Sequence, residues 1–246
     1  HTLGPASASD LYALSVRVDA AVEELRGSAL MSRLRHSLGS LTEPSCDRPV
    51  PRAIVCLGLG SFATAAAPRY QMALALLLRE ELLGLDPAPA HSAQVTPGHR
   101  SSAGGSVGEG GGPNQPVTDL DSFSGGELSA ATEATPGLCP RFCAYDPVFD
   151  ALERAFLHSR GYAVLTRNHE GRHTAHASHG CTLFFMPHCG RQLYSNLLTA
   201  NWGAETLARL LILGNSLTSY AGLPGTDRAA AWSALFRALP LLSETR

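Results

Sequence analysis

Two short runs of apolar residues constrain the fold of this chain more than any other feature. Residues 53–57 read Ala-Ile-Val-Cys-Leu and residues 181–186 read Cys-Thr-Leu-Phe-Phe-Met, and each run ends in small or polar residues. A strand that is apolar at successive positions has both of its faces buried, as strands of a parallel sheet do. We therefore expect a parallel sheet that is covered by helices on both faces.

Helical patterns alternate with these runs. We expect further strands at residues 162–166 and 207–213, and a helix that Asp146 caps, with Pro147 in its first turn and its end at Gly161. The other expected helices cover residues 9–38, 66–84, 191–202 and 228–240. Alternating strands and helices predict an α/β protein, a Rossmann-like three-layer sandwich with a mostly parallel sheet, preceded by an N-terminal amphipathic helix.

The segment 85–138 differs in composition from the rest of the chain. It is rich in Gly, Pro, Ser and Thr and contains the run Gly110-Gly111-Gly112. Such a segment cannot bury enough apolar surface to offset the entropy lost on ordering. We expect a disordered insertion here, which divides the chain into an N-terminal helix and linker (1–52) and one α/β domain (53–84 and 139–246).

Composition limits the partners and the cellular compartment. The net charge is −2 and only 16% of residues are charged, which argues against direct binding to nucleic acid or to an anionic membrane. No apolar run is long enough to span a bilayer. The six cysteines form no C-x-x-C pair, so a reducing compartment is expected, cytoplasmic and also nuclear.

The expected strands all end in small or polar residues. Ligands of open parallel sheets bind beyond the carboxyl ends of the strands, so these residues are candidates for one binding site. Turns also favour Gly, Asn and Ser for conformational reasons alone, and that interpretation stays open. The candidate ligand-binding residues are Gly58, Gly60, Ser61, Asn168, Glu170, His188, Asn215 and Ser216.

The run from Gly58 to Ala63 has the form G-x-G-x-x-A. Such a turn can present backbone N–H groups to a phosphate, but the dinucleotide motif also needs an acidic residue at the end of the next strand. Glu80 and Glu81 stand at about that distance and fall within an expected helix. A tight strand-to-helix turn is the simpler interpretation, and binding of NAD is not expected.

His188 and Cys189 form the other candidate group. They could supply a soft ligand or an activated thiolate before the next helix, or they could form only a capping turn. Cys139, which precedes Pro140, is a further candidate thiolate ligand of haem. The spacing of the histidines between 169 and 188 matches no structural zinc site, and no G-x-S-x-G motif of a serine hydrolase occurs, so neither a metal nor a hydrolase is predicted.

Several segments together resemble the Sensitivity to Red Light Reduced family, which is named after a plant clock protein. The matching segments are Gly58-Leu59-Gly60-Ser61-Phe62, Arg69-Tyr70-Gln71, Tyr145-Asp146-Pro147 with Glu153, Asn168 with Glu170-Gly171, Thr182 to Cys189, Leu193-Tyr194, Asn196-Leu197-Leu198, Ala200-Asn201-Trp202 and Gly214-Asn215-Ser216. The run Met-Pro-His-Cys followed by Leu-Tyr and Asn-Trp is the most specific part. The segment 85–138 is not part of the shared core, and the resemblance predicts a closing strand beyond Arg246.

The resemblance implies a regulatory protein, connected with circadian gene expression and, in animal members, with regulation of haem biosynthesis. It implies no defined reaction. The first hypothesis is therefore a non-catalytic regulator that binds haem, another small ligand or a protein partner, with Cys139, His188 and Cys189 as candidate haem ligands. The alternative is an enzyme acting on a nucleotide or an S-adenosylmethionine-like ligand, with Glu170 or His188 as general base.

Overall fold

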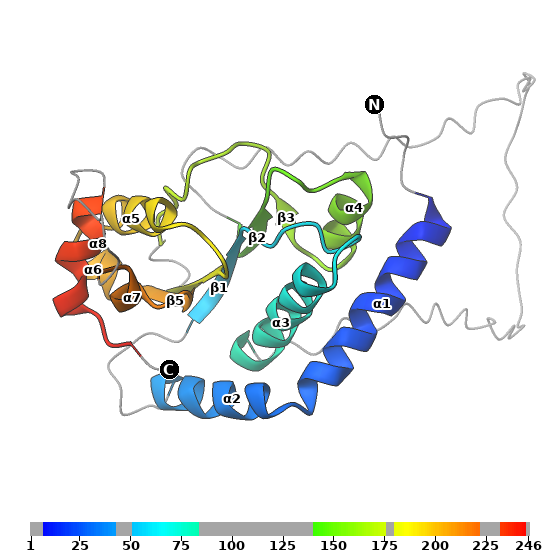
Figure 1. Ribbon diagram of the computed structural model, residues 1–246, viewed down its shortest axis with the longest axis horizontal. Coiled ribbons are helices and arrows are strands. Elements are labelled where there is room, and N and C mark those ends of the chain that lie inside the picture. The colour runs from blue at the N-terminus through cyan, green and yellow to red at the C-terminus, as the bar shows by residue number, and fades with distance from the viewer. Residues whose placement is uncertain (1–6, 43–50, 84–139, 176–179, 222–231, 245–246) are drawn as a thin grey trace, which may run out of the picture. The chain divides into compact units, whose positions relative to one another are not determined.

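We describe the chain from a computed structural model, which defines residues 7–42, 51–83, 140–175, 180–221 and 232–244. The expected disordered insertion, Cys139 and the histidines at 176 and 179 lie outside the described residues. Figure 1 shows a central sheet with helices packed on both of its sides. The α/β fold expected from the sequence is confirmed.

The sheet has five strands in the order β3-β2-β1-β4-β5, and every neighbouring pair is parallel. Their bounds are β1 Pro51–Leu57, β2 Phe142–Tyr145, β3 Ala163–Val164, β4 Cys181–Met186 and β5 Leu210–Gly214. From β1 the chain moves outward to β2 and β3, and then returns to the other side of β1 to form β4 and β5. The order therefore reverses between β1 and β4, which is where doubly wound sheets bind ligands.

Side chains of the central strands alternate between two apolar cores. Ile54 and Cys56 point into one core, whereas Val55 and Leu57 point into the other. The first core is covered by α1 Ala8–Arg26, α2 Ala29–Thr42, α3 Ala66–Leu83 and α4 Ala151–Ser159, and the second by α5 Arg191–Ala200, α7 Leu217–Ala221 and α8 Ser233–Ala238. A four-residue helix α6, Ala204–Leu207, precedes β5, and a 3-10 turn, Leu239–Leu241, follows α8. Burial on both faces explains the unbroken apolar runs.

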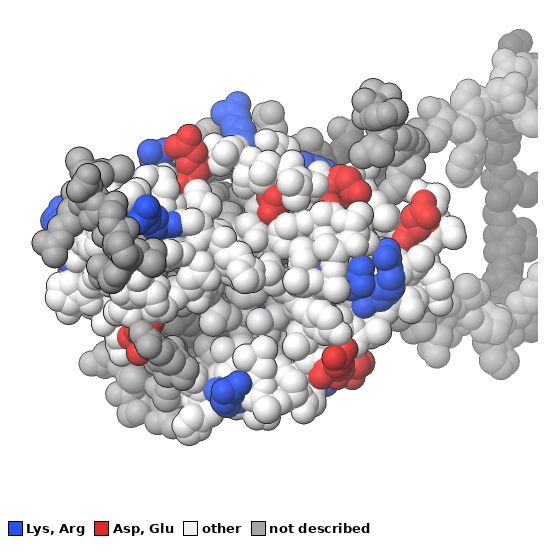
Figure 2. Space-filling view, viewed as in Figure 1, with Lys and Arg blue, Asp and Glu red and all other residues white. Residues whose placement is uncertain are grey.

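Charged side chains are spread over the surface rather than gathered by sign. On the face in Figure 2, arginines and carboxylates alternate around a largely uncharged centre. Among the residues that the structure defines, no helix is long and apolar enough to cross a membrane.

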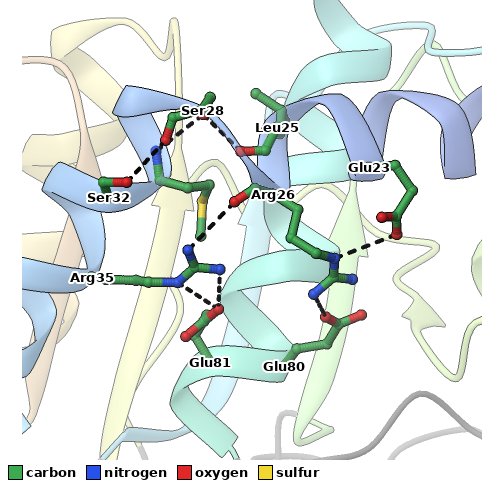
Figure 3. Close-up of polar contacts among 9 residues, drawn as sticks. Glu23, Leu25, Arg26, Ser28, Ser32, Arg35, Glu80 and Glu81 are labelled. Atoms are coloured by element: carbon green, nitrogen blue, oxygen red, sulfur yellow. Dashed lines mark hydrogen bonds and ion pairs between the residues drawn. The ribbon is translucent and has the colours of Figure 1, made fainter.

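The single N-terminal helix expected over 9–38 is two helices. The break falls at Gly27 and Ser28, where the Ser28 hydroxyl donates to the Leu25 carbonyl and accepts from the Met31 N–H. Figure 3 shows this corner and the ion pairs that tie it to α3, Arg26 with Glu80 at 2.8 Å and Arg35 with Glu81 at 2.7 Å. The cap of α1 is Ser7, which accepts from the Asp10 N–H. Asp10 itself lies in the first turn, where its charge is favourable.

The helix expected to start at Asp146 starts four residues later. Asp150 caps α4, and Asp150 and Glu153 form a reciprocal capping box. The predicted end is confirmed, because Gly161 lies just beyond the helix at a φ of +76°. The prediction that Asp146 caps this helix was wrong, since its carboxylate is bonded elsewhere, as described below.

Other boundaries differ more modestly. The strand expected over 162–166 is reduced to two residues, and β5 begins three residues later than expected because α6 occupies its predicted start. Residues 228–231 of the expected last helix lie outside the described residues. The strand β2 was not predicted at all.

Candidate functional site

The carboxyl ends of all five strands meet at one edge of the sheet, because every strand runs in the same direction. We call this the carboxyl edge. The turn Gly58 to Ala63 follows β1, Asp146 follows β2, and His188 and Cys189 follow β4. Asn215 follows β5, and the loop with Asn168 and Glu170 comes after β3.

The glycines after β1 are required by space and by backbone conformation. Gly58 and Gly60 have φ values of +70° and +72°, which side-chain-bearing residues rarely adopt. A Cβ at Gly58 would stand 2.8 Å from the Cys189 sulfur, and one at Gly60 would stand 3.1 Å from the ring of Pro68. The turn after β1 is thus packed directly against the turn after β4.

Two buried carboxylates hold this glycine turn. Asp146 accepts from the Gly60 N–H at 2.8 Å through one oxygen and from the Val148 N–H at 3.0 Å through the other. One oxygen of Glu153 accepts from the Ser61 hydroxyl and the Ala63 N–H, both at 2.9 Å. Glu153 is fully buried, and charge-assisted hydrogen bonds of this kind are strong.

These contacts determine what the glycine turn can offer to a ligand. Two of the N–H groups near an incoming phosphate are already bonded to internal carboxylates. The following helix begins only at Ala66, so the turn is not itself a helix N-terminus. Two negative charges beside the turn favour a neutral or cationic ligand group over a phosphate.

The turn after β4 is linked to β1 and to β5. The Cys189 thiol is buried and donates to the Leu57 carbonyl at 3.4 Å. Burial, with a smaller contribution from the Asp146 charge, raises the pKa of this thiol to about 11. Cys189 is therefore a thiol at neutral pH, which does not fit an activated nucleophile or a thiolate ligand. His188 stands beside it, exposed, at a φ of +58°.

Asn215 closes the other side of this turn. Its side-chain amide donates to the Cys189 carbonyl at 3.2 Å and to the Tyr220 hydroxyl at 2.8 Å. Tyr220 also donates to the Cys189 carbonyl, at 2.9 Å. Beneath them the buried Tyr194 hydroxyl donates to the Met186 carbonyl and accepts from the Asn215 N–H. Burial raises the pKa of Tyr194, so this hydroxyl stays protonated.

The loop after β3 is fixed mainly through α5. Glu170 has a φ of +51°, its N–H donates to the Asn168 side chain, and its carbonyl accepts from the Asn196 amide at 2.8 Å. The Glu170 carboxylate is exposed and pairs with Arg172 at 2.5 Å. Asn168 and Glu170 therefore shape this loop.

The structure joins some of the predicted residues directly and leaves others apart. Gly58 and Asn215 both lie against Cys189, and Gly60 bonds Asp146, whereas the described side chains of Glu170 and His188 are exposed and form no hydrogen bond or ion pair with each other. Ser61 bonds Glu153, and Ser216 bonds Thr218 and the Ser219 N–H. Among the described residues, no three His, Cys, Asp or Glu side chains form a metal-binding group.

Sequence reasoning missed Asp146 as a site residue, together with Glu153, Tyr194 and Tyr220. The signal for Asp146 was present: it is the acidic residue directly after the strand that pairs with β1. A search about twenty residues beyond the glycine turn could not find Asp146, because the segment 85–138 separates the two strands. Glu153 and Tyr194 gave no local signal beyond their place in the family resemblance, and Tyr220 gave none.

Comparison with known proteins places the chain in a family. The family model described as the SRR1 domain matches residues 29–90 and 127–245, which is well over half of the sequence. The chain belongs to the SRR1 domain family. This confirms the resemblance found in the sequence, and the match includes every residue of the carboxyl edge named above.

Individual relatives agree with this assignment. The chain is 49% identical to the SRR1-like protein of Mus musculus over 72 residues, 29% of this chain and 28% of the mouse protein. It is 28% identical to the protein Sensitivity to Red Light Reduced 1 of Arabidopsis thaliana over 199 residues, 81% of this chain and 49% of the plant protein. This SRR1 chain thus spans half or less of the length of the curated relatives it matches. No solved structure matches it.

Proposed function

We propose that this SRR1-domain chain is a regulatory protein of circadian gene expression and haem biosynthesis, which acts by holding a small ligand or a protein partner at its carboxyl edge. The observation that carries the proposal is the packing at the point where the strand order reverses. There Gly58, Gly60 and His188 all turn the backbone at positive φ, and the Cys189 sulfur packs against Gly58. Strained turns held from several sides are typical of binding sites.

The name of the Arabidopsis relative points to a light response, which supports a regulatory role for the present chain. We place the activity in the cytoplasm and also in the nucleus. The contacts at the edge suit recognition better than covalent catalysis, since Cys189 is protonated and the carboxylates of Asp146 and Glu153 are occupied by backbone groups.

Haem is the first ligand to test. Of the two candidate haem ligands that the structure describes, Cys189 is buried as a thiol and His188 is exposed, so His188 is the described candidate whose side chain can reach an iron. The test is a haem titration followed by absorption, with His188→Ala and with His158→Ala, an exposed histidine on α4, as the matched control. We expect the spectral change to be lost in the first variant alone.

The cellular role needs its own test. In cells that lack the protein, the wild-type chain should restore clock-gene transcript rhythms and the rate of haem synthesis, and the variant His188→Ala with Asn215→Ala should not. Full rescue by this variant would refute a role for the carboxyl edge. Turnover of a metabolite by the purified chain, whose loss alone abolished the rescue, would refute a non-catalytic regulator.

A second candidate function is favoured by Asp146. In doubly wound folds an acidic residue after the second strand binds the ribose of a nucleoside ligand, and Asp146 holds that place beside the glycine turn. Because the turn carries two carboxylates, a cationic ligand such as S-adenosylmethionine suits it better than a nucleotide phosphate. An enzyme of this kind would use Glu170 or His188 as general base.

Thermal shift separates these ligand classes, because a ligand at one hundred times its Kd stabilises by about 2.7 kcal/mol. If the second candidate is right, S-adenosylmethionine stabilises the wild-type chain, and Asp146→Asn removes the effect. Stabilisation by ATP or NAD of equal size would contradict the charge argument, and no shift with any of them would exclude this candidate.

A further inference from the structure

Two arginines from different helices meet at one backbone oxygen, at the end of the glycine turn. Arg17 of α1 donates from Nη1 to the Ala63 carbonyl at 3.1 Å, and Arg69 of α3 donates from Nη2 to the same oxygen at 3.5 Å. Arg69 also donates from Nε to the Phe62 carbonyl at 3.3 Å. Two like charges held around one neutral acceptor repel each other, unless an anion binds between or beside them.

Within the described part of the chain, neither arginine forms an ion pair. This sets them apart from Arg26, Arg35 and Arg160, each of which has a carboxylate within 2.8 Å. Arg17 Nε donates to the Ala13 carbonyl at 3.4 Å, and the remaining N–H groups of the two guanidinium groups have no acceptor among the described residues.

The carboxylates nearest to this arginine pair are engaged elsewhere. Asp19 is paired with Arg160, and Glu24 accepts from the Tyr70 hydroxyl. Glu153 is buried on the inner side of the turn, where it holds the Ala63 N–H and offsets part of the local positive charge. None of these three carboxylates forms a hydrogen bond or an ion pair with either arginine in the described part of the chain.

The position on α3 adds to the positive potential. Arg69 lies in the first turn of an 18-residue helix, where an acidic residue would normally compensate the dipole. Ala66 and Ala67 are exposed, and their N–H groups have no acceptor among the described residues. Pro68 has no N–H. Arg17 is exposed on α1 and Arg69 is partly exposed at the start of α3, so both can be reached from solvent.

We propose that Arg17 and Arg69 bind a phosphorylated serine or threonine of a protein partner. Paired guanidinium groups match the oxygens of a phosphate monoester, and recognition of phosphorylated segments by arginine clusters is a recurring mode. Small phosphates are bound in concave sites, whereas this arginine pair lies on an open surface that a protein segment can reach. This partner site adjoins the end of the glycine turn at Ala63, and its two arginines are not among the residues proposed as ligand contacts at the carboxyl edge.

The test uses the full chain and an immobilised peptide library with one fixed phosphoserine and randomised flanks, each peptide beside its unphosphorylated twin. Fluorescence anisotropy then measures the Kd of the best binder. The variants are Arg17→Gln and Arg69→Gln, whose amide nitrogens take the place of the arginine Nε atoms and can still donate to the Ala13 and Phe62 carbonyls. Arg33→Gln, an exposed arginine on α2, is the matched control for one lost charge.

We expect binding that requires the phosphate, a Kd raised about tenfold or more by either test variant, and no change in the control. Equal retention of the unphosphorylated twins, or the absence of any binder, would overturn the proposal. So would equal weakening by Arg33→Gln, which would indicate non-specific attraction. Competition by inorganic phosphate or AMP as tight as the peptide itself would assign a small-molecule site instead.

Discussion

Replacing Glu153 tests whether internal carboxylates hold the glycine turn. Its side chain is fully buried and accepts from the Ser61 hydroxyl and from the N–H groups of Ala63 and Asp150, at 2.9 Å each. Glu153→Ala removes all three hydrogen bonds and leaves two backbone donors near the core without an acceptor. A lost hydrogen bond to a charged group costs about 1.5–3 kcal/mol, and these losses are not fully additive.

We therefore expect Glu153→Ala to lower the free energy of unfolding by about 3–6 kcal/mol, a large part of the 5–15 kcal/mol typical of a domain. Glu153→Gln keeps one carbonyl oxygen toward Ser61 and Ala63, but it turns an NH2 group toward the Asp150 N–H. This milder variant should lose about 1–2 kcal/mol. It remains measurable if the alanine variant does not fold.

The measurement is urea denaturation followed by far-UV circular dichroism, with Glu205→Gln as control because Glu205 is exposed at the start of α6. The control should stay within about 0.5 kcal/mol of the wild type. A loss below about 1 kcal/mol for Glu153→Ala would refute the reasoning, since it would mean that the turn keeps its shape without the carboxylate.

Two further predictions concern the same edge of the sheet. Gly214→Ala would place a Cβ 2.3 Å from the Tyr194 hydroxyl and 2.8 Å from the Met186 carbonyl, so it should cost about 1–3 kcal/mol or more in chemical denaturation. Gly190→Ala, whose Cβ meets nothing within 4 Å, should cost only about 0.5 kcal/mol, for the weaker N-cap of α5, and a loss as large as that of Gly214→Ala would contradict the packing argument. Because burial raises the pKa of Cys189 from 9.0 to about 11, its contribution to stability is complete below pH 9 and is lost as the pH rises toward 11. The rate of Cys189 alkylation by iodoacetamide, followed by mass spectrometry, should keep rising with pH up to about pH 11, and a rate that levels off below pH 9 would show this to be wrong.

The central strands could be predicted because successive residues along them are apolar, as burial on both faces requires. Every position of the run Cys181–Met186 is buried, so the apolar pattern and the strand coincide. The strand β2 could not be found in this way. It has only four residues, it includes Cys143 and Ala144, which are weak indicators of strand, and it follows a long segment without periodicity.

The candidate site was predictable in outline, whereas its internal contacts were not. Parallel strand direction alone brings Gly58, Cys189 and Asn215 to one edge, and the sequence contains that information. The bonding of Asp146 to Gly60 depends on which strand pairs with β1, and the two residues are 86 positions apart. The rule that places the acidic residue about twenty positions after the glycine turn fails here, because the segment 85–138 lies between β1 and β2.

The packing of α1 has a practical consequence for where the protein can be cut. The family match begins at residue 29, but Leu14, Val18, Ala21 and Val22 of α1 are buried in the same core as α3 and α4. A chain shortened to the limits of sequence similarity would expose this apolar surface to water and invite aggregation. The smallest piece able to stand alone is therefore larger than the part that the family model matches.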